Sequence, residues 1–273
     1  MTAQPSLTAL PNLTDCLLEL DDGVATLTLN RHDVRNAVTG SAIIDDIIAV
    51  TDWVNRDQNI KVVIITGAGS AFCAGGNIKD MVDKGPDFGG DPHRVAETYR
   101  HGVQRMPLAM HACEAPIIAA VNGAAVGAGF DLMNMCDVRL ISSKAKMGET
   151  FVNLGIIPGD GGAWFLQRLI GYQRAAELTL SGRMITADEA LEYGLALEVL
   201  APDQLMPRAY AMARDMASKP TTALRLTKRL LKAAQRTELA DFLDLCAIFQ
   251  GVCHNEDEHM QAVTAMLERI SSK

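Results

Sequence analysis

Residues 116–131 read PIIAAVNGAAVGAGFD, and this stretch decides the expected fold of the chain. The apolar run 117–121 is bounded by Pro116 and Gly123, and it has the length and β-branching of a buried strand. A helical pattern begins at Phe130, and small residues fill the turn between the two elements. The sequence therefore predicts a strand that leads through a glycine-rich turn into a helix.

The start of this helix is a candidate binding site for an anionic oxygen. The first backbone N–H groups of a helix have no intrahelical partner and carry the positive end of the helix dipole. Small residues leave room for an oxygen to reach them, and Asp131 follows Ala128 by one helical turn, on the same face. A carboxylate would then lie beside the donors. The alternative is that the glycines serve only close packing of the helix against the strand.

A second unit of the same kind precedes the first. An apolar strand over residues 61–66 runs into the glycine-rich segment 67–76, and a helix is expected after Asn77. An oxyanion hole needs more than one backbone donor, and two such turns can provide one each.

The remaining pattern predicts an α/β body followed by helices. Residues 84–92 are too rich in glycine and proline for regular structure, so a mobile loop or lid is expected there. Residues from 203 onward follow a helical pattern, and we divide the chain into a body, residues 1–200, and a helical region, residues 201–273. The body should contain a β-hairpin over 16–20 and 24–29, helices over 41–55 and 93–113, strands over 138–141 and 197–200, and a capping box at 186–189. In the helical region, we expect helix breaks near 219–220 and 236–237.

The composition disfavours nucleic-acid and membrane partners. The 273 residues include 25 basic and 33 acidic side chains, a net charge of −8, whereas phosphate-binding surfaces normally need a basic excess. No apolar run approaches the ~20 residues that span a bilayer, and the first residues lack a signal-peptide pattern, so a cytoplasmic location is expected. The six cysteines and six histidines show no metal-binding spacing, so we expect reduced cysteines and no metal.

Two common enzyme motifs are missing from the glycine-rich turns. The pair Gly67 and Gly69 follows a strand, but the third glycine of a dinucleotide-binding motif would fall at Phe72. No G-x-S-x-G motif occurs, so the sequence offers no nucleophilic serine of the usual hydrolase type.

Five longer motifs occur in a defined order over nearly the whole chain. They are VATLTLNRHDVRNA (24–37), ITGAGSAFCAGGNIK (65–79), IAAVNGAAVGAGFD (118–131), GIIPG (155–159) and LSGRMITADEALEYGL (180–195). Together they resemble the crotonase superfamily, whose best-known member is enoyl-CoA hydratase. The resemblance implies an α/β fold built as a spiral of ββα units, with a C-terminal helical region that forms homotrimers or dimers of trimers. It also implies acyl-CoA thioester substrates and no further cofactor.

The resemblance assigns roles to particular residues of the two glycine-rich turns. The backbone N–H groups of Gly76 and Ala128 match the donors that hold the thioester oxygen as an enolate forms. A further set matches the region that binds the phosphates and adenine of coenzyme A. These residues are Arg35, Ala37, Ala74, Asn77, Ile78 and Lys79.

The catalytic acids depart from the hydratase pattern. The first of two glutamates falls at Asp131 and the second at Phe151, which cannot transfer a proton. Glu149 and Asp160 lie nearby as substitutes, and we favour Asp160 because a glycine-flanked loop can direct a short side chain into a cavity. The alternative for Asp160 is that it caps the helix expected from about residue 163.

These residues predict a lyase that hydrates a 2-enoyl-CoA to a 3-hydroxyacyl-CoA, with Asp131 and Asp160 transferring protons. Double-bond isomerisation of an enoyl-CoA is the alternative, because it needs only one carboxylate. A carbon–carbon bond hydrolase ranks third: hydrolases of this superfamily that act on β-diketones share the Pro-Gly-Asp-Gly turn but lack the Ala-Gly-Gly turn present at 74–76. Phe151 also leaves open a non-catalytic acyl-CoA-binding protein.

Overall fold

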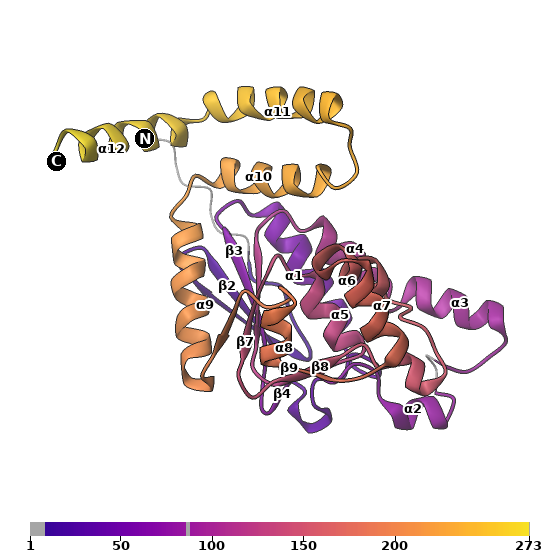
Figure 1. Ribbon diagram of the computed structural model, residues 1–273. Helices are drawn as coiled ribbons and strands as arrows, with labels where there is room; N and C mark the ends of the chain where they lie inside the picture. Colours follow the sequence, from indigo (N-terminus) through magenta and orange to yellow (C-terminus); the bar gives the residue numbers. More distant parts are fainter. Residues whose placement is uncertain (1–8, 86–87, 273) are drawn as a thin grey trace.

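The computed structural model describes residues 9–85 and 88–272 (Figure 1). Part of the loop predicted over 84–92, namely Pro86 and Asp87, lies outside the described residues. Within the described part, no helix has the length and apolar character needed to cross a bilayer.

A six-stranded sheet forms the centre of the body. Its strand order is β1-β2-β3-β5-β7-β10, and only the β1–β2 pair, the predicted hairpin, is antiparallel. Every residue of β5 is buried, as expected for an apolar parallel strand covered on both faces. The strands are β1 (Cys16–Asp21), β2 (Val24–Leu29), β3 (Val62–Gly67), β5 (Ile117–Val121), β7 (Val138–Ser142) and β10 (Glu198–Leu200).

A smaller sheet lies at the carboxyl ends of the central strands. Its order is β4-β6-β8-β9, and the chain passes from β3 to β4, from β5 to β6 and from β7 to β8. Each passage joins a long strand to a short one and then to a helix, which is the predicted ββα spiral. The short strands are β4 (Ala71–Cys73), β6 (Ala124–Val126), β8 (Lys146–Gly148) and β9 (Ile185–Thr186).

Helices cover both faces of the large sheet (Figure 1). Helix α9 (Pro202–Ala217) packs on one face, where Leu205, Ala209 and Ala213 share a core with side chains of β3, β5 and β7. The opposite face holds the larger core, in which Ile65 and Ala119 take part. The helices of the body are α1 (Ile43–Arg56), α2 (Ile78–Val82), α3 (Pro92–His101), α4 (Arg105–Ala112), α5 (Ala128–Met135), α6 (Gly162–Ile170), α7 (Tyr172–Ser181) and α8 (Ala187–Glu192), with short 3₁₀ turns at His32–Val34 and Phe151–Leu154.

Two predicted elements differ from the structure. The single helix expected over 93–113 is two helices, α3 and α4, because Gly102 adopts φ −109° and ψ −108°, which ends α3. Helix α5 begins at Ala128 rather than Phe130, since the residues between β5 and α5 include the short strand β6. Both differences arise at small residues, which fit several backbone conformations.

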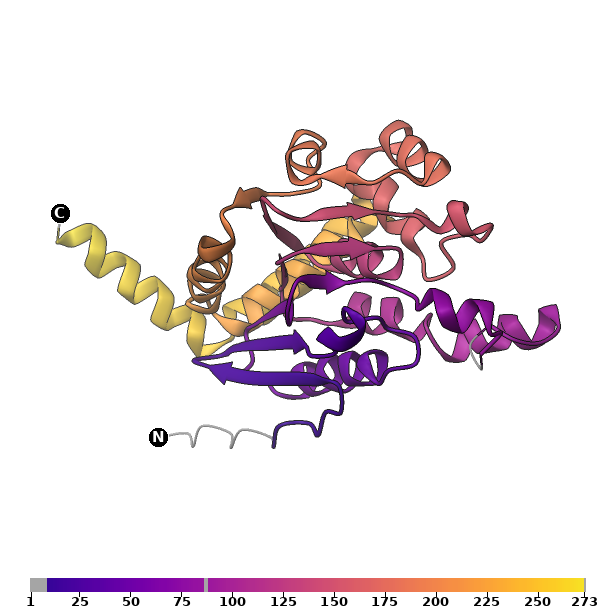
Figure 2. The same ribbon diagram turned by 90° about the horizontal axis from the view of Figure 1, so that it is seen from below.

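The C-terminal helices are α10 (Thr221–Ala233), α11 (Leu239–His254) and α12 (Asp257–Ser271), with breaks at the predicted positions. Helix α10 is bound to the body: Arg225 donates to the carbonyls of Val54, Asp57 and Ile60, and Lys228 donates to Ala115 and pairs with Asp137. Helices α11 and α12 contain no buried residue, and α12 extends away from the body in both views (Figures 1 and 2).

Candidate active site

The two glycine-rich turns pack directly on each other. A Cβ atom at Gly75 would lie 2.3 Å from the carbonyl oxygen of Val126, and one at Gly129 would lie 2.0 Å from that of Cys73. Side chains cannot occupy such space, and Gly75 has in addition a φ of 79°. Glycine at these positions therefore lets the turn after β4 contact the turn after β6.

This contact brings the predicted oxyanion donors together. Gly76 and Ala128 both line a cavity of about 290 Å³. Ala128 is the first residue of α5, where the N–H groups have no intrahelical acceptor. Among the described residues, no acceptor receives the N–H of Gly76 or of Ala128. Two backbone donors are thus available to an oxygen in the cavity.

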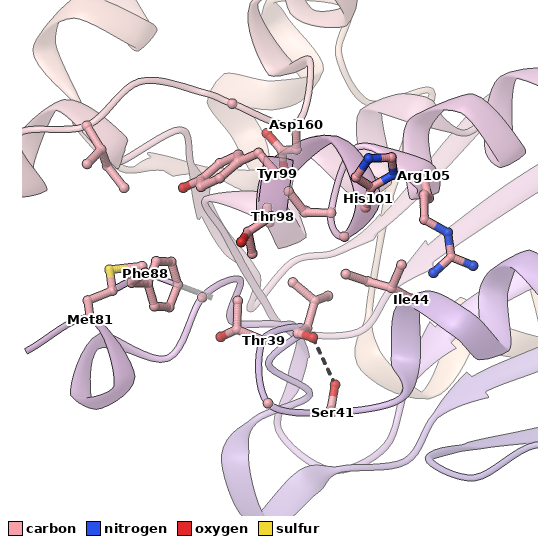
Figure 3. Close-up of a pocket in the computed structure, with 18 of the residues that line it drawn as sticks. Thr39, Ser41, Ile44, Met81, Phe88, Thr98, Tyr99, His101, Arg105 and Asp160 are labelled. Atoms are coloured by element: carbon pink, nitrogen blue, oxygen red, sulfur yellow. Dashed lines mark hydrogen bonds between the residues drawn. The ribbon is translucent and has the colours of Figure 1, made fainter. Parts of the chain in front are cut away.

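Both apolar and polar side chains line the cavity wall (Figure 3). Asp45 and Arg105 form an ion pair of 2.7 Å at the solvent-exposed mouth. Asp160 lies deeper, beside Tyr99, on the side opposite Thr39 and Ser41 in Figure 3. The apolar and aromatic lining residues include Ile44, Met81, Phe88, Tyr99, Phe151 and Ile156.

Three carboxyl groups are buried behind this wall. Asp131 on α5, Glu149 after β8 and Asp160 before α6 are 0%, 1% and 2% exposed. Only Asp160 lines the cavity; Asp131 and Glu149 lie behind it. The structure thus brings the three predicted carboxylates together but directs one of them at the cavity.

Asp131 occupies the centre of the cluster. A Cβ atom at Gly162 would lie 2.2 Å from both Asp131 Oδ2 and Glu149 Oε1, so these two oxygens are close neighbours. Asp131 also contacts the carboxyl group of Asp160. Among the described residues, no side chain outside the cluster donates to the oxygens of Asp131 or Asp160, whereas the Thr179 hydroxyl donates to Glu149 Oε2.

Burial raises the pKa of all three carboxyl groups. Burial is the largest cause for each, and for Asp131 the charges of Asp160 and Glu149 add to it, which places the Asp131 pKa well above its usual range. The Thr179 hydroxyl acts in the opposite direction on the Glu149 pKa without overcoming burial. The cluster therefore keeps protons at a pH where exposed carboxylates have lost them.

Asp160 is not the N-cap residue of α6, because that position is Gly161, with φ 95°. A backbone hydrogen bond from Gly162, the first residue of α6, nevertheless lowers the Asp160 pKa, so Asp160 lies both at the start of this helix and at the cavity. Phe151, at the position of the second hydratase glutamate, lines the cavity with an apolar ring.

The predicted coenzyme A region forms one continuous edge beside the donors. Ala74 N–H donates to Arg35 O at 2.9 Å, and Asn77 N–H donates to Thr39 Oγ1 at 2.7 Å. Ala37 is buried, so only its backbone can meet a ligand, whereas Arg35, Ile78 and Lys79 have exposed side chains.

Sequence reasoning overlooked two residues that shape the site. Asn36 is fully buried with φ 59°, and its amide donates to the carbonyls of Ala68, Ala71 and Phe72, which fixes the turn after β3. Thr179 contacts Glu149 across 30 residues of sequence, and no local pattern signals this contact.

Comparison with known proteins shows which family has this fold. The family model described as Enoyl-CoA hydratase/isomerase matches residues 19–273. The chain belongs to this family. It is 33% identical over 262 residues to the short-chain-enoyl-CoA hydratase of Clostridium acetobutylicum, covering 94% of this chain and 96% of the relative. It is 34% identical to the crotonyl-CoA hydratase of Syntrophomonas wolfei (93% and 95% covered) and 33% identical to the 1,2-epoxyphenylacetyl-CoA isomerase of Escherichia coli (93% and 96% covered).

Solved structures support the same assignment for this family member. The enoyl-CoA hydratase of Bacillus anthracis matches with a TM-score of 0.86 and 31% identity, covering 94% of this chain and 97% of the other. The putative enoyl-CoA hydratase of Streptomyces coelicolor A3(2) matches with a TM-score of 0.87 and 28% identity, covering 98% and 97%. The predicted superfamily, the α/β fold and the enzyme class are therefore confirmed.

Proposed function

We propose that this family member hydrates a 2-enoyl-CoA to a 3-hydroxyacyl-CoA by way of a thioester enolate. The observation that carries the proposal is that the N–H groups of Gly76 and Ala128 and the carboxyl group of Asp160 share one cavity. Hydratases among the relatives support it, since two of them are named for this reaction.

The cavity supports the following sequence of bond changes. The thioester oxygen accepts hydrogen bonds from Gly76 and Ala128, which draws electron density from the C2–C3 double bond and makes C3 electrophilic. Water attacks C3 and gives one proton to the Asp160 carboxylate. The enolate charge rests on the thioester oxygen until Asp160 returns that proton to C2. The elements of one water molecule are thereby added across the double bond.

The coenzyme A group is proposed to lie along the edge formed by residues 35–39 and 74–79, as the hydrogen bonds between these segments suggest. The Arg35 and Lys79 side chains extend from this edge and suit phosphate groups. The substrate would carry its own coenzyme A, so no separate cofactor enters the mechanism. The matching positions are Arg35, Ala37, Ala74, Asn77, Ile78 and Lys79.

Double-bond isomerisation is the second candidate. One observation favours it: of the described residues that line the cavity, Asp160 is the only buried carboxyl group, and Phe151 faces it. A single carboxylate can remove a proton from C2 of a 3-enoyl-CoA and return it to C4, which moves the double bond to C2–C3. One relative is named as an isomerase of an acyl-CoA, 1,2-epoxyphenylacetyl-CoA isomerase, although its named substrate is an epoxide rather than an enoyl-CoA.

We further propose a homotrimer or a dimer of trimers in the cytoplasm. Helices α11 and α12 bury none of their residues within the chain, although they carry exposed Leu243, Ile248, Met260 and Leu267. All six cysteines are free thiols, which suits a reducing compartment.

A turnover assay on a panel of 2-enoyl-CoAs tests the proposal. The enzyme should consume crotonyl-CoA or a longer homologue, and Asp160→Asn should lower turnover by about a hundredfold or more, because it removes the proton carrier. Asp188→Asn is the control, since Asp188 is exposed on α8. Turnover of 3-enoyl-CoAs alone would favour the isomerase. Failure of the folded enzyme to convert any enoyl-CoA would leave acyl-CoA binding as its function.

A further inference from the structure

The proposed reaction uses one carboxyl group of the cluster and leaves two unexplained. Asp131 and Glu149 are buried, yet neither lines the cavity where a substrate would lie. An unpaired buried charge is costly, so a group with no role in the site would usually be replaced by an apolar side chain. Of the three carboxyl groups, Asp160 alone lines the cavity, so the other two can act on a substrate only through Asp160.

The contacts define an order within the cluster. Thr179 meets Glu149, Glu149 meets Asp131, and Asp131 meets Asp160. Asp160 alone ends at the cavity. These contacts therefore connect α7, through the two hidden carboxyl groups, to Asp160 at the cavity.

The number of protons in this cluster follows from hydrogen-bond chemistry. Two carboxylates in contact repel, whereas a carboxylic acid and a carboxylate bond strongly through the shared proton. Three carboxyl groups with two contacts therefore need two protons and carry one negative charge. The Thr179 hydroxyl supplies the remaining donor at the far end.

Within the described part of the chain, no cation neutralises further charges of the cluster. The groups that face the cluster include the Thr179 hydroxyl from α7, the buried Cys73 thiol from β4, the Tyr99 side chain of α3 beside Asp160 (Figure 3) and the backbone of Gly162 in α6. Among the described residues, no lysine, arginine or histidine forms an ion pair with Asp131, Glu149 or Asp160. Burial raises the pKa of each carboxyl group, which agrees with retained protons. The hydrogen bonds within the cluster raise the pKa of Asp131 and lower those of Glu149 and Asp160, so Asp131 holds its proton most firmly.

We propose that Thr179, Glu149, Asp131 and Asp160 form a directed hydrogen-bond chain, in which Glu149 and Asp131 carry the two protons and Asp160 carries the one negative charge facing the substrate. Thr179 donates to Glu149, Glu149 donates to Asp131, and Asp131 donates to Asp160. The proposal rests on the proposed function, because it assigns Asp160 as the group that accepts the substrate proton.

In this hydrogen-bond chain Asp131 and Glu149 are positioning residues. The O–H of Asp131 fixes the orientation of the Asp160 carboxylate, and Asp160 becomes neutral when it takes a proton from water, so no second charge has to be accommodated. Loss of the Glu149 proton at high pH would add a negative charge and break the donor order. The hydrogen-bond chain therefore predicts that turnover falls at high pH, as Glu149 loses its proton.

Two conservative substitutions test this assignment through the pH profile of kcat with crotonyl-CoA. Glu149→Gln keeps a donor toward Asp131 and an acceptor for Thr179 but has no proton to lose, so kcat should stay within about tenfold and the basic limb should vanish. Thr179→Val removes the hydroxyl that favours ionised Glu149, so the basic limb should move to higher pH. Thr51→Val is the control, because Thr51 is a buried threonine whose hydroxyl donates to the carbonyl of Ile48 within α1.

The Asp131→Asn variant tests whether Asp131 positions Asp160 or touches the substrate itself. Its amide can donate to Asp160 and accept from Glu149, so kcat should fall by no more than about tenfold, while Asp160→Asn loses about a hundredfold or more. Equal losses in the two variants would place Asp131 on the substrate and overturn the chain. Unchanged profile shapes in both Glu149→Gln and Thr179→Val would also overturn it, while leaving the proposed function intact.

A second measurement tests the number of protons even if the enzyme is inactive or the variants do not fold. Infrared spectroscopy of the native enzyme should show the carbonyl band of protonated carboxyl groups at neutral pH, and Glu149→Gln should weaken it where it folds. Absence of such a band in the native enzyme would refute the proton count. This result would not depend on turnover, so it is distinguishable from failure of the proposed function.

Discussion

Gly162 lies so close to Asp131 that a Cβ atom at residue 162 would be 2.2 Å from Asp131 Oδ2. Gly162 is the first residue of α6, and its φ is not in the left-handed region, so glycine is needed here for space rather than for backbone conformation. The start of α6 thereby closes the carboxyl cluster from one side.

Gly162→Ala should disturb both stability and catalysis. The new methyl group must displace Asp131 and Glu149, and forced overpacking of this kind costs about 1–3 kcal/mol. We expect a lower Tm and a loss of turnover of at least about tenfold. Gly251→Ala in α11 is the control, because no atom lies within 4 Å of the position that its methyl group would take and alanine favours helices. A Gly162→Ala enzyme with native Tm and turnover would show that the cluster is not tightly closed.

The raised pKa values make stability depend on pH in a defined direction. The folded state holds protons on Asp131, Glu149 and Asp160 more tightly than the unfolded chain does, so folding is favoured below the unfolded-state pKa near 4 and this contribution is lost as pH rises through the raised values. Asp131→Asn removes one such group. Its Tm relative to wild type should therefore be higher at pH 8 than at pH 5.

Thermal unfolding at the two pH values measures this difference. A gain of about 2–4 °C is expected for each kcal/mol of repulsion removed in a protein of this size. A gain that is larger at pH 5 than at pH 8 would mean that the Asp131 pKa is lowered in the folded state rather than raised.

Coenzyme A binding should depend on Arg35. Its exposed guanidinium extends from the segment bonded to Ala74, next to the proposed oxyanion donors. Calorimetry with acetyl-CoA should show weaker binding for Arg35→Ala than for wild type. Arg56→Ala is the matched control, because Arg56 is an exposed cation on α1 that does not line the cavity. Equal affinity in wild type and Arg35→Ala would remove this residue from the site.

The C-terminal helices should mediate assembly. Leu243 and Ile248 are exposed on α11, which buries no residue within the chain. Light scattering should give at least a trimer for the wild type and a smaller species for the double variant Leu243→Glu, Ile248→Glu. Leu191→Glu on α8 is the control for an added charge at an exposed leucine. A monomeric wild type at micromolar concentration would contradict the proposed oligomer.

The parts of the fold with strong local signals were predictable from sequence. Residues 117–121 form β5 with the predicted bounds, because a short apolar run with β-branched residues at both ends, bounded by Pro116 and Gly123, favours a buried strand over a helix. The capping box of Thr186 and Glu189 is confirmed, with both reciprocal hydrogen bonds present. Such features depend on neighbours a few residues away.

Features that depend on distant partners were not predictable. The segment Ala124–Val126 is a strand because it pairs with β4 and β8, and its small residues alone fit a turn equally well. In the site, the position of Asp131 behind Asp160 depends on the approach of Gly162 in α6. The sequence identified the three carboxylates but not their order.

The central claim is that backbone N–H groups at Gly76 and Ala128 stabilise the enolate, and a pair of substitutions at one residue tests it most directly. Gly76→Pro removes the N–H, whereas Gly76→Ala keeps it and places a methyl group 2.8 Å from Met81 Cε, the flexible end of a side chain. With crotonyl-CoA, kcat of the folded Gly76→Pro enzyme should be about a hundredfold or more below that of Gly76→Ala. Equal kcat in the two variants would contradict the account, because the thioester oxygen would then not depend on this donor.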